Sequence, residues 1–221
     1  RFYGINYRVL AKKIDAISWD SYPAFHNDYE SYADTMLSAA FDNAIMRSMK
    51  KDKPFLLMES APGLVNWMQY NKLKRPGVHE QFAMQTIACG SDSVQYFQFR
   101  KGRGSSEQYH GAIIGHDNSD KTRIFREVSE VGQTLKDISQ VCGSAPESKV
   151  ALIYNWDNTW ILDQAMFGDN RDKKYIETIK DHYAAWKSLG YDVDVIDQSR
   201  MVIPAMRGDE ITGATLMADI G

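Results

Sequence analysis

The chain has 221 residues, of which 43% are apolar and 25% charged, and its formal net charge at pH 7 is −3. This composition is typical of one large or two modest globular domains, and the lack of a basic excess argues against a nucleic-acid-binding protein. No stretch is apolar over enough residues to predict a membrane-spanning helix, so we expect neither nucleic acid nor a membrane as partner.

Three strand–helix pairs are predicted in the first two thirds of the chain. Apolar or alternating runs predict strands, and apolar side chains that recur every three or four residues predict helices. The strands are expected at residues 14–19, 54–59 and 93–99, and the helices at residues 29–50, 78–89 and 121–141. Because the strands begin about 40 residues apart, they indicate a repeated β/α unit with long loops.

This repeat predicts an α/β protein with a parallel sheet, either an open doubly wound sheet or a (β/α)8 barrel. No glycine-rich phosphate loop follows any of the three strands, which counts against a nucleotide-binding open sheet. A (β/α)8 TIM barrel needs eight such units in about 250 residues. We therefore expect residues 1–145 to be the C-terminal portion of a barrel whose earlier units lie upstream, with the chain entering its first strand almost directly.

A change of pattern after Pro146 predicts a second, partial α/β domain over residues 146–221. Strands are expected at residues 149–154 and 190–196, with an amphipathic helix at residues 172–189 between them. Beyond Gln198 the pattern weakens, and the short pieces at residues 201–204 and 208–210 predict no complete unit.

The cysteine content indicates the cellular compartment of the protein, and the aromatic content indicates the class of ligand it could bind. Cys89 and Cys142 are far apart, with no Cys or His at metal-ligand spacing, which predicts a reducing, cytoplasmic location and no metal site. Five tryptophans and an aromatic content of 12% are high. Such side chains fill cores, and they also provide the flat walls that sugar rings require.

Glu59 is the first candidate for chemistry. It closes the apolar strand at residues 54–59, and the carboxyl ends of parallel strands are where barrel active sites lie. The residue types leave two readings open, a catalytic carboxylate or a loop cap paired with an arginine.

Aromatic side chains near the same strand ends could line the same cleft. Tyr22 follows the first strand and Trp67 follows the second, and both are expected to be accessible because they stand beside proline and asparagine. Trp19, inside the first strand, is expected to pack in the core.

A long polar loop with several glycines at residues 99–111 follows the third strand. Its Glu107 and His110 could offer an acceptor and a donor to neighbouring hydroxyls of one ring. Its basic residues could instead bind phosphate, and a solvated loop without function also fits.

Six segments strongly resemble the glycoside hydrolase family 42 β-galactosidases. They lie in order over about 110 residues, which makes a chance similarity improbable. The segments are residues 17–23, 54–60, 65–67, 71–77, 90–98 and 103–111.

The resemblance implies a fold and a function. It implies a (β/α)8 catalytic barrel followed by a Rossmann-like trimerisation domain, and hence a homotrimer. It implies a β-galactoside as substrate, with Glu59 as nucleophile at the end of the seventh barrel strand. Tyr22, Trp67, Glu107 and His110 would surround the galactosyl ring. The chemistry requires no cofactor.

The chain also departs from the family pattern. The acid/base glutamate of the family follows an asparagine, and no Asn-Glu pair occurs in these 221 residues. The Arg and Asn sugar ligands, and the cysteine zinc cluster of some members, would also lie upstream. Gly63 and Gly102 stand where related sequences carry serine. Two hypotheses follow: a retaining β-galactosidase, or a catalytically incomplete carbohydrate-binding or assembly fragment of one.

Overall fold

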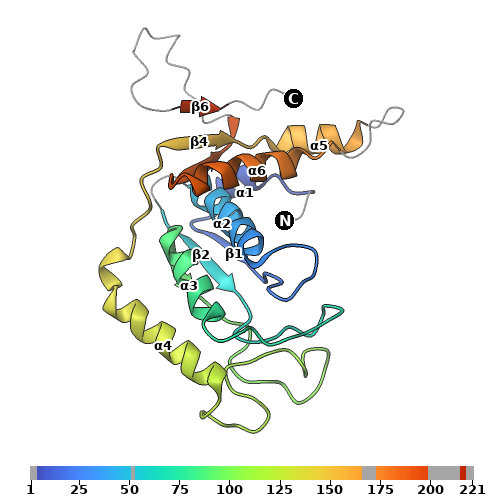
Figure 1. Cartoon of the computed structure of the whole chain (residues 1–221), viewed down its shortest axis with the longest axis vertical. Coiled ribbons are helices and arrows are strands. Elements are labelled where there is room, and N and C mark those ends of the chain that lie inside the picture. The colour runs from blue at the N-terminus through green and yellow to red at the C-terminus, as the bar shows by residue number, and fades with distance from the viewer. Residues whose placement is uncertain (1–3, 51–52, 166–172, 199–214, 218–221) are drawn as a thin grey trace.

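The computed structural model describes residues 4–50, 53–165, 173–198 and 215–217, whose strands form two parallel three-stranded sheets (Figure 1). The elements of the first part are α1 (Tyr7–Ala11), β1 (Ile17–Asp20), α2 (Tyr32–Met49), β2 (Phe55–Glu59), α3 (Val78–Ala88), β3 (Ser91–Val94), α4 (Arg123–Asp137) and the short 3-10 helix η1 (Ser139–Val141). The elements of the second part are β4 (Val150–Ile153), α5 (Trp156–Gln164), α6 (Tyr175–Ser188), β5 (Val193–Ile196) and β6 (Thr215–Met217).

The first sheet has the order β1-β2-β3, with every neighbour parallel, which confirms the predicted β/α repeat. In β2, Phe55 and Leu57 are fully buried under the helices, but Met58 on the other face is 44% exposed. An apolar run such as residues 54–58 predicts a parallel strand buried on both faces, and for β2 this prediction is wrong among the described residues.

Helix α2 lies between the two sheets and belongs to both cores (Figure 1). Its Met36 packs in a cluster with Leu57 of β2. Its Phe41 and Ile45 pack in a second cluster with residues of β4 and β5, such as Val195. The helix begins where the side chains and backbone N–H groups of Ser31 and Asp34 form a capping box, three residues later than predicted.

A buried arginine joins the two parts. Arg47 of α2 is 9% exposed, and its guanidinium donates to the Asp194 carboxylate at 2.8 Å. It also donates to the carbonyl oxygens of Val193 at 2.9 Å and of Cys89 at 2.8 Å. These bonds connect α2 with β5 and with the end of α3.

The predicted third strand is misplaced, because it forms at Ser91–Val94 instead of residues 93–99. The alternation of polar and aromatic residues over residues 93–99 suggested a longer strand, but two of these aromatic side chains pack against histidine rings instead. Tyr96 packs against His79 with centroids 5.2 Å apart, and Phe97 packs against His110 at 4.9 Å.

Other boundaries differ in smaller ways. The chain does not enter directly into a strand, because α1 comes first and Ile14, predicted in β1, is 39% exposed before it. Helix α5 was not expected, although Asn155 caps it by accepting from the Asp157 and Asn158 N–H groups. The predicted start of α6 at Asp172 and the pieces at residues 201–204 and 208–210 lie outside the described residues.

In the described part of the chain, no helix combines the length and the apolar character needed to cross a membrane.

We expect the 221-residue chain, expressed by itself, to associate with copies of itself. Among the described residues, β1 and β3 each pair on one side only, and open strand edges promote association. Sedimentation analysis and melting curves at increasing protein concentration test this. A sharp melting transition that does not depend on concentration, given by a monomer, would contradict it.

Candidate active site

The long loops that follow β1, β2 and β3 leave the first sheet at the end that points away from the second sheet (Figure 1). Three parallel strands therefore bring their carboxyl ends, and the side chains placed there, to one edge. In a β/α barrel this edge is the catalytic face.

A β-bulge sets the direction of Glu59. Trp19 pairs with Leu57 and Asp20 pairs with Glu59, so Met58 has no partner on β1. Bulges of this kind bend a strand and redirect the following side chain, and they are common beside active sites. The backbone N–H of Ser21 donates to the Glu59 carbonyl at 2.9 Å, which fixes the two strand ends together.

The Glu59 carboxylate accepts a hydrogen bond from the Tyr22 hydroxyl. Burial of the ring, this bond, and the nearby carboxylates of Glu59, Asp20 and Glu107 all raise the pKa of Tyr22. Tyr22 therefore stays protonated and acts as a donor. No arginine forms an ion pair with Glu59 in the described ranges. The alternative hypothesis, that Glu59 only caps a loop and pairs with an arginine, therefore lacks the arginine it requires among these residues.

Two rings lie against Tyr22. Trp67 is 56% exposed, as expected of an accessible wall, and its ring meets the Tyr22 ring edge-on with centroids 5.6 Å apart. His110 meets it edge-on at 6.0 Å. Trp19 is partly buried and packs with two core clusters, as predicted.

His110 is much less accessible than its polar loop suggests, with 2% exposure. Its Nδ1 donates to the Gly111 carbonyl oxygen at 3.0 Å, which leaves Nε2 as an acceptor for a ligand hydroxyl. The orientation of this ring is therefore fixed by its own loop.

Glu107 is exposed and contributes to the field that raises the pKa of Tyr22, so its charge acts on the same cluster. In the part of the chain that the structure describes, no ion pair joins Glu107 to Arg100 or Arg103. Arg100 instead donates to Asn118. The structure thus places Glu59, Trp67 and His110 in contact with Tyr22, and the charge of Glu107 acts on the pKa of the same residue.

Sequence reasoning missed Asp20. This residue ends β1 beside Glu59, and burial, with the Glu59 charge as the second cause, raises the pKa of its carboxyl. The signal was the position of Asp20 at the carboxyl end of a strand, two residues before Tyr22.

Sequence reasoning also missed the contact between the two longest loops. The Gly111 N–H donates to the Leu64 carbonyl at 2.8 Å, and the Asn66 amide donates to the Ser106 carbonyl at 2.6 Å. A Cβ atom on Gly111 would lie 2.4 Å from the Leu64 carbonyl oxygen. Only glycine allows this approach, which holds the loop of Glu107 and His110 against the loop of Trp67.

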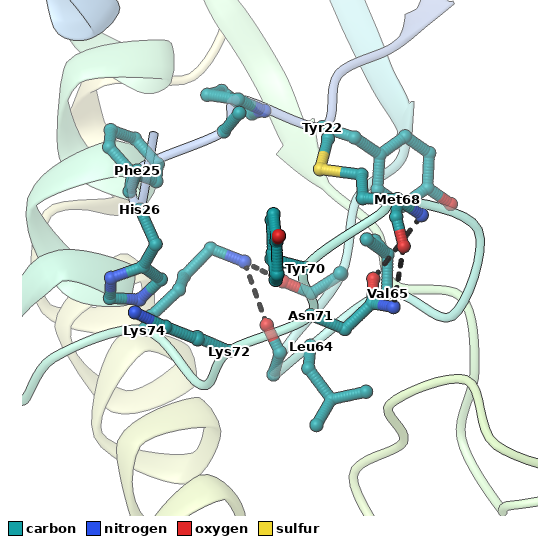
Figure 2. Close-up of a pocket in the computed structure, with 14 residues that line it drawn as sticks. Tyr22, Phe25, His26, Leu64, Val65, Met68, Tyr70, Asn71, Lys72 and Lys74 are labelled. Carbon is teal, nitrogen blue, oxygen red and sulfur yellow. Dashed lines mark hydrogen bonds between the residues drawn. The ribbon is translucent and has the colours of Figure 1, made fainter. Parts of the chain in front are cut away.

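A small pocket of about 40 Å³ lies beside Tyr22, between the loop after β1 and the loop after β2 (Figure 2). Its walls include Phe25, His26, Tyr70 and Lys74. The volume is far below the roughly 300–1,000 Å³ of small-molecule pockets, and it is sufficient for water. We therefore do not assign this pocket to a sugar ring.

Comparisons with known proteins match most of this chain. Residues 1–138 match the family model of the glycoside hydrolase family 42 β-galactosidases, and residues 148–202 match the model of the β-galactosidase trimerisation domain. Among similar proteins, β-galactosidase GalA of Bacillus licheniformis is 49% identical over 199 residues, which are 90% of this chain and 29% of GalA. β-Galactosidase GanA of Bacillus subtilis is 47% identical over 203 residues, 92% of this chain and 30% of GanA.

The solved structure of Gan42B, a family 42 β-galactosidase from G. stearothermophilus, superposes with a TM-score of 0.86 at 47% identity, over 90% of this chain and 29% of Gan42B. The chain thus spans less than a third of the length of these relatives. Its fold is the C-terminal part of a (β/α)8 barrel followed by the start of a Rossmann-like α/β domain, as expected. The chain therefore belongs to the glycoside hydrolase family 42 β-galactosidases.

Proposed function

We propose that the protein to which this chain belongs is a retaining β-galactosidase that removes terminal non-reducing β-D-galactosyl residues. The observation that carries the proposal is the hydrogen bond from Tyr22 to the carboxylate of Glu59 at the carboxyl end of β2, beside an exposed Trp67. Family membership supports the same reaction class.

In the proposed mechanism Glu59 attacks the anomeric carbon and forms a galactosyl ester while the leaving-group oxygen takes a proton from a second carboxyl group. That group then activates a water molecule, which cleaves the ester and restores the configuration. The two carboxyl groups of a retaining enzyme stand about 5 Å apart. The second one is the glutamate of the family's Asn-Glu pair, which these residues do not contain.

The remaining candidates are assigned to the sugar. Trp67 offers its exposed ring to the C–H face of galactose, and Glu107 accepts from ring hydroxyls. His110 accepts a further hydroxyl at Nε2. Tyr22 donates to Glu59, which aligns the nucleophile.

Hydrolysis of an aryl β-D-galactoside by the complete gene product tests the proposal, and NMR of the first-formed sugar reports its anomeric configuration. A β-anomer supports retention, and an α-anomer would exclude the double displacement. Binding of galactosides without hydrolysis would instead support the second hypothesis, a catalytically incomplete carbohydrate-binding or assembly fragment of such an enzyme.

The assembly, the domain division and the location are further parts of the proposal. The match of residues 148–202 to a trimerisation domain supports a homotrimer. It also supports a division between a catalytic part, residues 1–145, and a second domain, residues 146–221. Cys89 and Cys142 are free thiols, which suits a cytoplasmic enzyme.

We expect Tyr22→Phe to lower kcat by about 10- to 100-fold, because a hydrogen bond to a charged group is worth about 1.5–3 kcal/mol. Steady-state kinetics of the complete gene product measure the effect. Tyr29→Phe, which removes a hydroxyl from a 74% exposed ring in the same loop, is the matched control. Equal activity of both variants would remove Tyr22 from the mechanism.

We expect Glu107→Gln to lower kcat/KM by about 10- to 100-fold, because the amide keeps the shape of the side chain but lacks the charge that strengthens hydrogen bonds to hydroxyls. Galactosides that lack single ring hydroxyls locate the contact. The analogue without the hydroxyl bound by Glu107 should lose little further in the variant. If every analogue loses the same factor, Glu107 does not recognise a hydroxyl.

A further inference from the structure

Lys74 is a buried cation that the proposed mechanism does not use. Its side chain is 8% exposed, and its Nζ donates to the carbonyl oxygens of Ala61 at 2.8 Å and of Gly63 at 3.2 Å (Figure 2). It forms no ion pair within the described ranges. Its ammonium group is therefore bound by neutral backbone oxygens.

Burying a charge in this way opposes folding. Burial lowers the pKa of Lys74 to about 8, and the carboxylate of Glu127 opposes this only in part. An apolar side chain of the same length would fill the space without the cost of removing a charge from water. Stability alone therefore does not account for an ammonium group at this position.

The two carbonyl groups belong to the turn between Glu59 and Trp67. The start of this segment is fixed because the Ser60 hydroxyl donates to the Gln95 carbonyl at 2.9 Å. The other end of the segment is fixed because the carbonyl oxygen of Leu64 accepts a hydrogen bond from the Gly111 N–H. Between these two points, Lys74 binds the carbonyl groups on either side of Pro62.

Lys74 is itself anchored to a helix. Arg123, at the beginning of α4, donates to the Lys74 carbonyl oxygen at 2.8 Å and forms an ion pair with Glu127 at 2.7 Å. A continuous set of contacts thus runs from α4 through Lys74 to the turn that follows Glu59.

We propose that Lys74 is a positioning residue, whose ammonium group fixes the turn at residues 61–63 so that Glu59 and Trp67 face the same sugar ring. The inference rests on the proposed glycosidase function. Lys74 has no contact with the substrate in this role and acts through the backbone it binds. A shift of the nucleophile by about 1 Å can slow a reaction by about 100-fold.

Lys74→Met in the complete gene product tests the role, with Lys72→Met as the matched control on an exposed lysine two positions earlier. We expect kcat for an aryl galactoside to fall at least about 10-fold with a smaller change in KM. We also expect slower covalent labelling of Glu59 by an activated 2-deoxy-2-fluorogalactoside, which reports nucleophilic attack directly. The melting temperature should change little, because the loss of two hydrogen bonds and the removal of a buried charge oppose each other. Lys72→Met should match the wild type.

Folded Lys74→Met protein with wild-type kcat and labelling rate would overturn the proposal. A loss of activity that only follows the loss of folded protein would overturn it too. If Lys74→Met does not fold, Lys74→Gln replaces it, because the uncharged glutamine amide ends one bond short of the lysine nitrogen that binds the two carbonyl groups. Wild-type kcat in that folded variant would also overturn the proposal. If neither variant folds, Lys74 is a stability residue and the proposal fails. An inactive wild-type protein would instead refute the proposed function itself.

Discussion

Replacement of Glu59 by glutamine is expected to lower kcat by about 10⁴-fold or more while leaving sugar binding largely intact. The amide has the shape of the carboxylate, and its oxygen can still accept from Tyr22, so the contacts around the galactosyl ring are preserved. The amide cannot form the galactosyl ester, so the first chemical step is lost. Steady-state kinetics and equilibrium binding of a galactoside by the purified variant separate the two effects.

A smaller side chain and an external nucleophile supply a second, positive test. Glu59→Gly leaves space on the face from which the carboxylate attacks, and azide added to this variant should yield a galactosyl azide of inverted configuration. Glu130→Gln, an exposed glutamate on the outer helix α4, is the control and should behave as wild type. Substantial hydrolysis by purified Glu59→Gln protein would exclude Glu59 as the nucleophile.

Elements with local boundary signals were predicted well from the sequence. Helix α3 was expected at residues 78–89 and forms at Val78–Ala88. Gly77 and Gly90 bound it, and both adopt positive φ angles, of 82° and 98°. Such glycines stop a helix whatever packs around it, so the signal is readable without a structure.

Features that depend on contacts between distant segments were not predicted. Polar and apolar residues largely alternate over residues 93–99, as in a strand, but β3 ends at Val94. The rings of Tyr96 and Phe97 each pack against a histidine from another segment. The bulge at Met58 likewise depends on pairing with β1. Periodicity describes one segment at a time, so neither feature has a signal in its own residues.

In the candidate site too, features with a local sequence signal were predicted, and features that depend on distant contacts were not. The positions of Glu59, Tyr22 and Trp67 at strand ends followed from the β/α pattern, and the resemblance to a family suggested their roles. Neither showed that His110 would be almost inaccessible, or that Gly111 would touch Leu64. The contact between Gly111 and Leu64 holds the loop of His110 against the loop of Trp67. Removal of this contact should therefore lower the activity strongly.

Gly111→Ala is expected to lower kcat/KM by about 100-fold. The new Cβ would lie 2.4 Å from the carbonyl oxygen and 2.9 Å from the nitrogen of Leu64, and backbone atoms held on both sides cannot move aside independently. The two loops must therefore separate. This breaks the 2.8 Å hydrogen bond from Gly111 and moves Trp67 away from Glu107. Displacements of about 1 Å in a catalytic site have costs of this size.

Gly104→Ala in the same loop is the matched control, because a Cβ there meets no atom within 4 Å. It should retain wild-type kinetics, and limited proteolysis should cut the loops faster only in Gly111→Ala, since a loop that loses its backbone contacts opens more often. Equal kinetics of the two variants would show that the contact between Gly111 and Leu64 does not hold the site together. Loss of activity in Gly111→Ala with unchanged proteolysis would place its effect at the neighbouring His110 instead of in loop separation.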